Sequence, residues 1–128
     1  MRRRSLHAAS WALFAFGLLL TGCSLGQVPA AAPIKGPYQV VNVTARNFSW
    51  HLSKTNLSLD ENVKFVVTSL EGVHGFSIKG TNVSSPVAQG AAPAVVYWHP
   101  PQKGTYIVQC NVYCGTGHDA MQTTFTVS

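Results

Sequence analysis

The sequence predicts an all-β sandwich or barrel, and three observations support this fold class. Short runs rich in β-branched and aromatic residues alternate with Gly, Asn, Ser and Pro breaks from residue 38 onward, as in strands joined by turns. No helical hydrophobic period is sustained in this stretch. About 90 residues suffice for one modest hydrophobic core. We therefore expect one folded β domain over residues 38–128.

Seven strands are expected in chain order. The clearest lies at residues 62–69, where Val63, Phe65 and Val67 occupy every second position and therefore share one face. Val66 makes the opposite face of this strand less polar than that of a typical half-buried strand. The expected strands are residues 38–45, 48–52, 62–69, 75–79, 95–98, 104–109 and 122–127.

The first 22 residues are typical of an export signal. Three arginines at positions 2–4 precede an apolar run at residues 11–20, which is shorter than the about 20 apolar residues that a membrane span needs. Residues 20–23, Leu-Thr-Gly-Cys, resemble the bacterial lipobox, in which the chain is cut before the cysteine and lipid is attached to it. We expect a signal peptide at 1–22 and a lipid on Cys23. An uncleaved anchor and a plain signal peptide are the alternatives.

Residues 23–37 connect the expected lipid site to the folded domain. They are rich in Ala, Gly and Pro, which predicts a flexible tether. A lipid on Cys23 would hold the domain on the outer face of the cytoplasmic membrane, in the bacterial cell envelope. Removal of the signal leaves six Lys and Arg against four Asp and Glu. Because this balance is close to neutral, we expect no nucleic-acid partner.

Metal-binding side chains are concentrated in residues 110–121. Two thiols, Cys110 and Cys114, are followed by the imidazole of His118 and the thioether of Met121. Soft sulfur ligands with imidazole favour copper, zinc or iron clusters, and a thioether favours copper. The simplest alternative is a disulfide between the two cysteines, which is natural in an exported protein. A zinc site would leave the thioether unused.

The number of cysteines distinguishes two kinds of copper site. A mononuclear blue copper site uses one Cys, two His and a weak axial Met, which would leave Cys110 without a role. A binuclear site with two bridging thiolates uses both cysteines but needs a second imidazole. His74 is the best candidate for it, because it precedes the expected strand 75–79 and has Gly75 beside it. A glycine there lets another segment of backbone approach closely.

The pattern Cys-x3-Cys-x3-His-x2-Met at residues 110–121, together with residues 73–76 and 104–106, resembles the CuA domain of subunit II of heme-copper cytochrome c oxidases. The likeness extends over roughly residues 40–127. It is closest to the b-type branch, which has a shorter subunit II with similar His-Gly-Phe and Gly-Thr-Asn passages. Nitrous oxide reductase has the same pattern in its own CuA domain, so the pattern indicates the centre rather than the enzyme. Gly115 favours the oxidase form.

The resemblance implies a cupredoxin fold, a Greek-key β-sandwich or barrel, that holds two copper ions in a binuclear centre. Two bridging thiolates would bind both coppers, and each copper would take one imidazole. The implied ligands are His74, Cys110, Val112 through its carbonyl oxygen, Cys114, His118 and Met121. Many subunit II proteins have an acidic residue in place of Val112, which helps to bind magnesium. The valine side chain cannot do so.

The resemblance also implies one-electron transfer from a cytochrome c-type donor to subunit I of a heme-copper oxidase. Nucleophile, base and orienting groups do not cluster in the sequence, so we expect an oxidase component with no catalytic group of its own. An apolar shell of Phe76, Val112 and Tyr113 is expected to exclude water from the centre. Two alternatives stay open: a free-standing, membrane-tethered CuA electron carrier for another reductase, and a copper storage or delivery protein.

Five other residues have weaker claims to a role. His51 and His99 are interpreted as exposed histidines rather than metal ligands. Phe48 and Trp50 lie in a region where the family resemblance places an aromatic residue that receives electrons from cytochrome c, although both can be ordinary core or surface aromatics. Asp119 is interpreted as a solvated loop acid rather than a partner of the centre.

Overall fold

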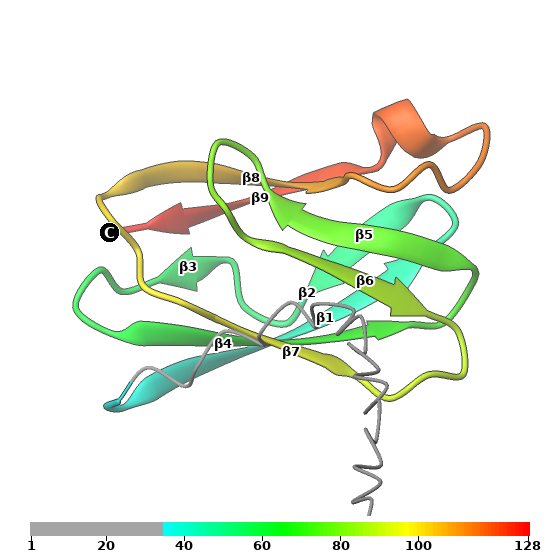
Figure 1. Ribbon diagram of the computed structural model, residues 1–128. Helices are drawn as coiled ribbons and strands as arrows, with labels where there is room; N and C mark the ends of the chain where they lie inside the picture. The colour runs from blue at the N-terminus through cyan, green and yellow to red at the C-terminus, as the bar shows by residue number, and fades with distance from the viewer. Residues whose placement is uncertain (1–34) are drawn as a thin grey trace, which may run out of the picture.

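The computed structural model describes residues 35–128, which form a sandwich of two mixed β-sheets (Figure 1). One sheet has the strand order β2-β1-β4-β7 and the other the order β3-β9-β8-β5-β6. The elements are β1 (Tyr38–Arg46), β2 (Ser49–Leu52), β3 (Asn56–Leu57), β4 (Asn62–Ser69), β5 (Val73–Ile78), β6 (Ser84–Ala88), β7 (Ala94–Trp98), β8 (Gly104–Cys110), the 3₁₀-helix η1 (His118–Ala120) and β9 (Gln122–Val127). The expected all-β fold class is confirmed.

The expected signal peptide, Cys23 and most of the expected tether lie outside the described residues. Between residues 35 and 128, no helix has the length and hydrophobicity of a membrane span.

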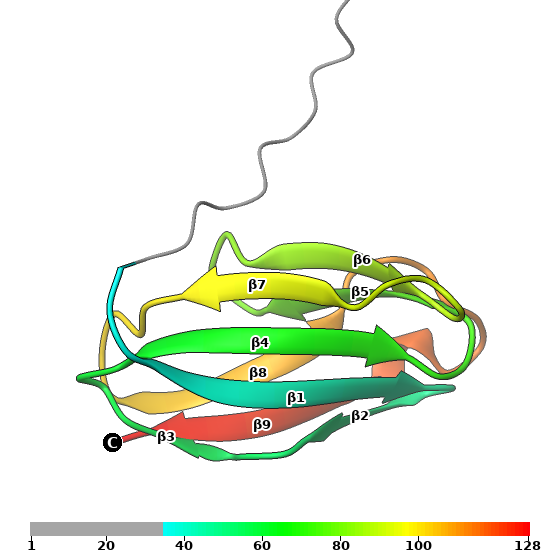
Figure 2. The ribbon, with the colours of Figure 1, turned by 90° about the horizontal axis from the view of Figure 1, so that it is seen from below.

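Both sheets combine parallel and antiparallel pairs. In the first sheet, β1 runs parallel to β4 and antiparallel to β2, and β4 is antiparallel to β7. In the second sheet, β3 is parallel to β9, and the β9-β8-β5-β6 pairs are antiparallel. Figure 2 shows β7, β4 and β1 side by side across the face of the first sheet. The parallel pairing places the ends of β1 and β4 at the same end of the sandwich.

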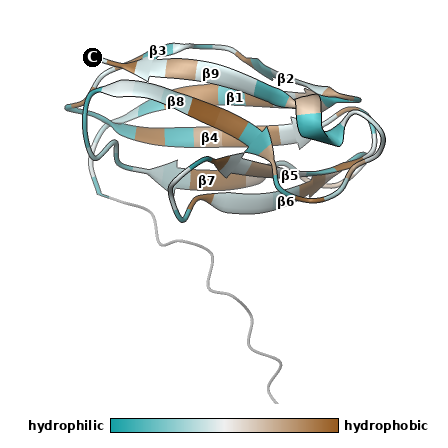
Figure 3. Cartoon of the chain, turned by 90° about the horizontal axis from the view of Figure 1, so that it is seen from above, coloured by the Kyte–Doolittle hydropathy of each residue, from teal (hydrophilic) through white to brown (hydrophobic). Residues whose placement is uncertain are grey.

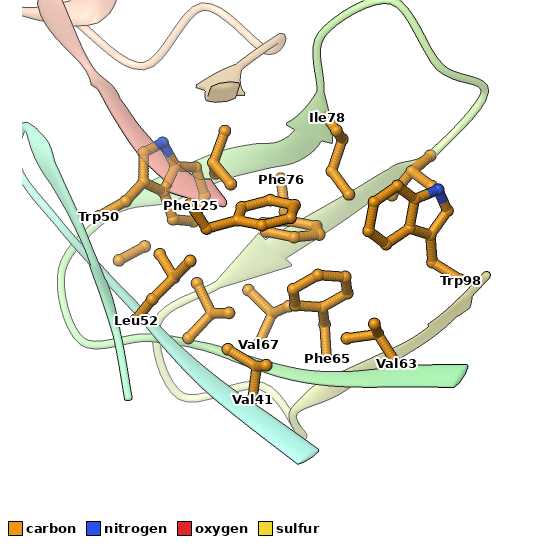
Figure 4. Packing of buried hydrophobic residues seen from close by; sticks show 14 of the residues in the cluster. Val41, Trp50, Leu52, Val63, Phe65, Val67, Phe76, Ile78, Trp98 and Phe125 are labelled. Atoms are coloured by element: carbon orange, nitrogen blue, oxygen red, sulfur yellow. The ribbon is translucent and has the colours of Figure 1, made fainter. Parts of the chain in front are cut away.

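The strands follow the alternation of apolar residues in the sequence. In β4, Val63, Phe65 and Val67 are fully buried, and the residues between them are only half-buried. Apolar and polar segments alternate along the strands in Figure 3. Phe65 packs against Phe76 and Phe125, with ring centroids 5.3 and 5.9 Å away. These three rings lie between Trp50 on one side and Trp98 on the other (Figure 4), so aromatic packing fills the space between the sheets.

Two strands and one short helix were not expected from the sequence. β6 contains Pro86, which cannot donate a ladder hydrogen bond, but β6 is an edge strand, where proline is tolerated. β3 is only two residues long. The short helix η1 lies in the segment that joins β8 to β9.

The two ends of the sandwich carry different segments. The start of β1 and the C-terminus lie at one end, and the β8–β9 connection with η1 lies at the other (Figures 1 and 2). His74 lies near the start of β5, and Cys110 ends β8. The metal-binding side chains expected from the sequence therefore gather at the end of the sandwich farthest from the C-terminus.

Candidate metal centre

Backbone hydrogen bonds fold residues 110–121 back on themselves. The N–H of Cys110 donates to the carbonyl oxygen of Met121 over 3.2 Å and closes the base of the loop. Inside the loop, the N–H of His118 donates to Gly115 and the N–H of Met121 donates to His118, each over 3.1 Å. These bonds return the loop to the strand end from which it left. Cys114, His118 and Met121 are thereby brought next to Cys110.

The expected ligand atoms lie close together. The two cysteine sulfurs are 3.4 Å apart, and both cysteines are free thiols, because a disulfide bond would require about 2.05 Å. The Sγ atom of Cys114 lies 3.6 Å from Nδ1 of His118 and 3.8 Å from Sδ of Met121. The carbonyl oxygen of Val112 lies 3.0 Å from Sγ of Cys110. The loop therefore supplies one cluster of sulfur, nitrogen and oxygen donors.

His74 reaches this cluster from the neighbouring strand β5. A ring nitrogen of His74 and the sulfurs of Cys110 and Cys114 all lie within 4.8 Å of one another. The ring of His74 is fully buried and lies at 66° to the indole of Trp50, with centroids 6.0 Å apart. The second imidazole that the sequence analysis required is therefore beside both thiols.

The two ring nitrogens of His74 have different surroundings. Nε2 lies 2.6 Å from the carbonyl oxygen of Glu71, and a carbonyl can only accept, so Nε2 carries the proton. Nδ1 is buried and has no hydrogen-bond partner among residues 35–128. A buried lone pair without a partner is costly unless something binds it. Because a neutral imidazole binds metals through its bare nitrogen, Nδ1 of His74 fits a metal ligand.

A clamp between two turns holds the side chain of Glu71 in place. The carboxylate of Glu71 accepts a hydrogen bond from the Asn47 N–H over 3.0 Å and forms an ion pair with Arg46 at 2.9 Å. The Asn47 N–H first, and then the Arg46 guanidinium, hold the pKa of this carboxyl below its usual value of 4.5. The clamp ties the β1–β2 turn to the segment that orients His74.

Two glycines let the loop pack closely against its neighbours. At Gly75, an added Cβ would collide with the side chain of Asn111 and the backbone of Val112. At Gly117, an added Cβ would collide with the ring of Phe48. The expectation that glycine beside His74 permits close approach is thus correct. Gly117 is a second glycine that permits a close approach, and it lies inside the loop itself.

Burial raises the pKa of the Cys114 thiol to about 11, and the neighbouring Cys110 thiol adds to the shift. In the metal-free protein at neutral pH this thiol is therefore protonated. Metal ions bind the thiolate, so binding must release this proton and becomes more favourable as the pH rises.

The donor set fits copper better than other metals. Two thiols, two imidazoles and a thioether are soft or borderline ligands, which favour copper over magnesium or calcium. The fully buried thioether of Met121 lies against Cys114, where a zinc site would have no use for it. The buried Nδ1 of His74, which has no hydrogen-bond partner among the described residues, is the feature of this structure that indicates a metal ion.

The structure corrects the expected apolar shell. Phe76 is fully buried, as expected, but Val112 and Tyr113 are 39% and 77% exposed. The loop presents these two side chains to solvent because its inner side is occupied by the sulfur and imidazole groups. Trp50 and Phe76 form the buried aromatic wall of the site, and the exposed ring of Tyr113 lies against His118 with ring centroids 5.6 Å apart.

The weaker candidates are distributed around the fold. His51 and His99 are exposed, and Nδ1 of His99 pairs with the side chain of Asn62 at 2.9 Å. Asp119 is exposed, as expected for a solvated loop acid. Trp50 is a core residue, whereas Phe48 is half-buried beneath the loop.

Sequence reasoning missed the role of Glu71. This residue acts on His74 through a backbone carbonyl, which every residue type has. Its position three residues before His74 was the only signal in the sequence. A carbonyl contact of this kind becomes visible only when the turn is folded.

Comparison with known proteins decides the family. No family model matches the chain. The chain is 35% identical over 101 residues to the cytochrome c oxidase subunit 2 of Thermus thermophilus, and the match spans 77% of this chain and 74% of the relative. The chain belongs to the cytochrome c oxidase subunit 2 family. A subunit 2 from a named strain of the same species is also 35% identical over 101 residues, and the match spans 60% of its length.

Solved structures agree with membership of the subunit 2 family. One chain of a heme-copper terminal oxidase dimer is 27% identical, with a TM-score of 0.59 over 71% of this chain and 64% of that one. The periplasmic domain of subunit II (CoxB) of Bradyrhizobium japonicum is 14% identical, with a TM-score of 0.63 over 70% and 83%. Rusticyanin is 17% identical, with a TM-score of 0.58 over 74% and 82%. The last two show the shared fold, which confirms the cupredoxin-like architecture, and the resemblance to a subunit II CuA domain is confirmed.

Proposed function

We propose that residues 38–128 form a binuclear CuA domain that relays single electrons in a heme-copper oxidase. The observation that carries this proposal is that a ring nitrogen of His74 and the thiols of Cys110 and Cys114 lie within 4.8 Å of one another, while the buried Nδ1 of the same ring has no hydrogen-bond partner among the described residues. Membership of the cytochrome c oxidase subunit 2 family agrees with it.

Each ligand has a distinct role in this proposal. Cys110 and Cys114 would hold two copper ions as shared thiolates, and His74 and His118 would each bind one of the ions through nitrogen. The remaining two ligands are weak, namely the thioether of Met121 and the carbonyl oxygen of Val112. Two ions use both sulfurs, whereas a single-copper site would use only one of them.

Bound copper supplies a redox couple whose charge change is shared over two metals. Reorganisation of the ligands slows electron transfer. Fast transfer therefore requires the chain to keep the ligand arrangement the same in both redox states. Cys110 is held by strand pairing through its neighbours in β8, and His74 is held by the Glu71 carbonyl. The buried rings of Trp50 and Phe76 exclude water from one side.

The proposed partners follow from the relatives. We propose a cytochrome c or another small redox protein as electron donor and the heme-copper oxidase subunit I as acceptor. The relatives are named cytochrome c oxidase subunit 2, and one similar chain belongs to a heme-copper terminal oxidase dimer. A subunit I gene beside the gene of this protein would support this pairing, and a solitary gene would favour a free carrier.

The expected organisation of the N-terminal part completes the proposal. Residues 1–22 form a signal peptide of the lipoprotein type, Cys23 receives lipid, and residues 23–37 form the tether. The Leu-Thr-Gly-Cys sequence at residues 20–23 supports it. The domain would then work on the outer face of the cytoplasmic membrane. Mass spectrometry of the protein from its native membrane tests this, since a lipid on the N-terminal cysteine adds the mass of its acyl chains.

Metal analysis with EPR spectroscopy tests the centre. The purified protein, reduced and then loaded with copper, should hold two copper ions per chain and show hyperfine coupling to both nuclei. Cys110→Ser should abolish the shared signal, and His99→Ala, far from the cluster, should leave it unchanged. Coupling to a single copper nucleus in the unaltered protein would contradict the binuclear proposal. Rapid loss of copper to a weak chelator would favour a storage or delivery role.

A further inference from the structure

The backbone of Gly75 makes an unusual pair of hydrogen bonds beside Cys110. Its carbonyl accepts from the Asn111 N–H over 3.0 Å, and its own N–H donates to Sγ of Cys110 over 3.4 Å. In a regular antiparallel pair, two opposite residues exchange both N–H bonds, so the Gly75 N–H would donate to the Asn111 carbonyl. The regular β5–β8 ladder ends here, and its last donor is directed to sulfur instead.

The side chain of Asn111 holds this residue away from regular strand pairing. Its Nδ2 atom donates to the hydroxyl of Ser84 over 2.8 Å. Ser84 lies on β6, and β5 separates β6 from β8. The Asn111 side chain therefore passes over β5 at Gly75, where an added Cβ would collide with Asn111 Oδ1. These contacts form a continuous link from the edge of the sheet to the sulfur of Cys110.

We propose that Ser84 is a positioning residue that keeps the Gly75 N–H on the Cys110 sulfur and thereby raises the reduction potential of the copper centre. This inference rests on the proposed function and adds a residue that adjusts its centre. A hydrogen bond to a metal-bound thiolate stabilises negative charge on sulfur. The thiolate carries more of that charge when the metal is reduced, so the bond favours the reduced state.

The link can be broken without damage to the core. Ser84 and Asn111 are both exposed, so loss of the hydroxyl leaves no buried polar group without a partner. Without the Ser84 hydroxyl, Asn111 is free to turn its carbonyl toward Gly75 and complete the ladder. The Gly75 N–H would then leave the sulfur while the strands stay paired.

The first test measures the reduction potential of the copper-loaded protein. Ser84→Ala should disfavour reduction about tenfold, which corresponds to a potential lower by about 59 mV for one electron. Ser84→Thr keeps the hydroxyl and should restore the original potential. Ser85→Ala is the matched control, because Ser85 lies next on β6, opposite Phe76, and its side chain makes no hydrogen bond among the described residues.

The second test needs no metal. In the reduced, metal-free protein, the Gly75 amide proton should exchange about tenfold more slowly in Ser84→Ala than in Ser85→Ala, because a ladder bond to the Asn111 carbonyl replaces the weaker contact with sulfur; the thermal midpoint should be the same for both. Asn111→Ala should match Ser84→Ala, and the double variant should add nothing, since both changes break one link. Equal Gly75 exchange in Ser84→Ala and Ser85→Ala would overturn the inference. Failure to bind copper would overturn the proposed function, and the exchange comparison would still decide whether the link exists.

Discussion

Nε2 of His74 donates a hydrogen bond to the carbonyl oxygen of Glu71 over 2.6 Å, and this single bond prepares the opposite ring nitrogen for a metal. Because the proton is fixed on Nε2, Nδ1 keeps its lone pair, on a ring that lies beside the two thiols. The nitrogen is buried and has no other partner between residues 35 and 128. The protein therefore fixes the metal-binding tautomer of His74 before any ion arrives.

His74→Ala should remove one nitrogen ligand and one of the two proposed copper ions. The two bridging thiols and His118 remain, so some copper should still bind, but the EPR signal should lose coupling to two nuclei. Copper analysis and EPR spectra of the purified variant measure this change. His99→Ala removes an exposed histidine that pairs with Asn62 and serves as control. Unchanged stoichiometry and coupling in His74→Ala would show that His74 is not a ligand.

The predictable parts of the fold are those in which local pattern and tertiary packing agree. The alternation of Val63, Phe65 and Val67 predicted β4 at the bounds that the structure has. The edge strand β6 was missed because Pro86 argues against a strand unless its edge position is known. β5 begins two residues earlier than expected, at Val73, because its pairing with β6 extends past the glycine break in the sequence.

The residues of the candidate site also divide into those that the sequence predicts and those that only the folded structure shows. Cys110, Cys114, His118 and Met121 lie within twelve residues, so their spacing alone indicates a shared site. His74 is distant in sequence and was found because a binuclear centre needs a second imidazole. Contacts through backbone groups or ordinary hydroxyls carry no sequence signal, and they emerge only when β5, β6 and β8 are placed side by side. The exposure of Val112 and Tyr113 could likewise not be predicted, because it depends on how the loop folds onto the sheet.

Glu71→Gln should change the pH dependence of stability. The folded-state pKa of Glu71 lies below 4.5, so the charged carboxylate stabilises the fold above about pH 4.5, and this contribution is lost as the pH falls through the lower, folded value. The variant should therefore unfold more easily than the unaltered protein at about pH 7, and this difference should shrink as the pH falls below about 4.5. Chemical denaturation across this range measures the difference.

Glu61→Gln is the control for that comparison. Glu61 forms no ion pair among the described residues, so Glu61→Gln removes a carboxylate without breaking a clamp of this kind. Added salt should shrink the effect of Glu71→Gln, because the ion pair with Arg46 is exposed and therefore screened. An equal pH profile for both variants would argue against the clamp.

Gly117→Ala should displace the ligand loop from Phe48. The backbone of Gly117 has φ −95°, which any residue can adopt, so the cost comes only from the collision of the new Cβ with the ring. Overpacking of this kind costs about 1–3 kcal/mol. The visible spectrum of the copper-loaded variant should also change, because His118 follows directly in the chain. Urea unfolding and absorption spectra measure both effects.

A second substitution separates the collision from other causes. In a Phe48→Ala background the ring is absent, so adding Gly117→Ala should cost little, and the two changes should be strongly non-additive. Thr116→Ala, at an exposed position of the same loop, should leave stability and spectrum nearly unchanged. Additive effects of the Phe48 and Gly117 substitutions would show that the ring does not support the loop.

Met121→Leu separates two roles of one buried side chain. Met121 is fully buried, and its Sδ atom lies 3.8 Å from Sγ of Cys114, so it can act as a core residue and as a weak ligand. Leucine keeps the volume at a cost below about 1.5 kcal/mol but removes the thioether. If the thioether donates to oxidised copper, its loss should raise the reduction potential, while the metal-free variant unfolds nearly as the unaltered protein does. Potentiometry of the loaded form and urea unfolding of the metal-free form measure the two roles. An unchanged potential together with a lower unfolding free energy would leave Met121 with a packing role alone.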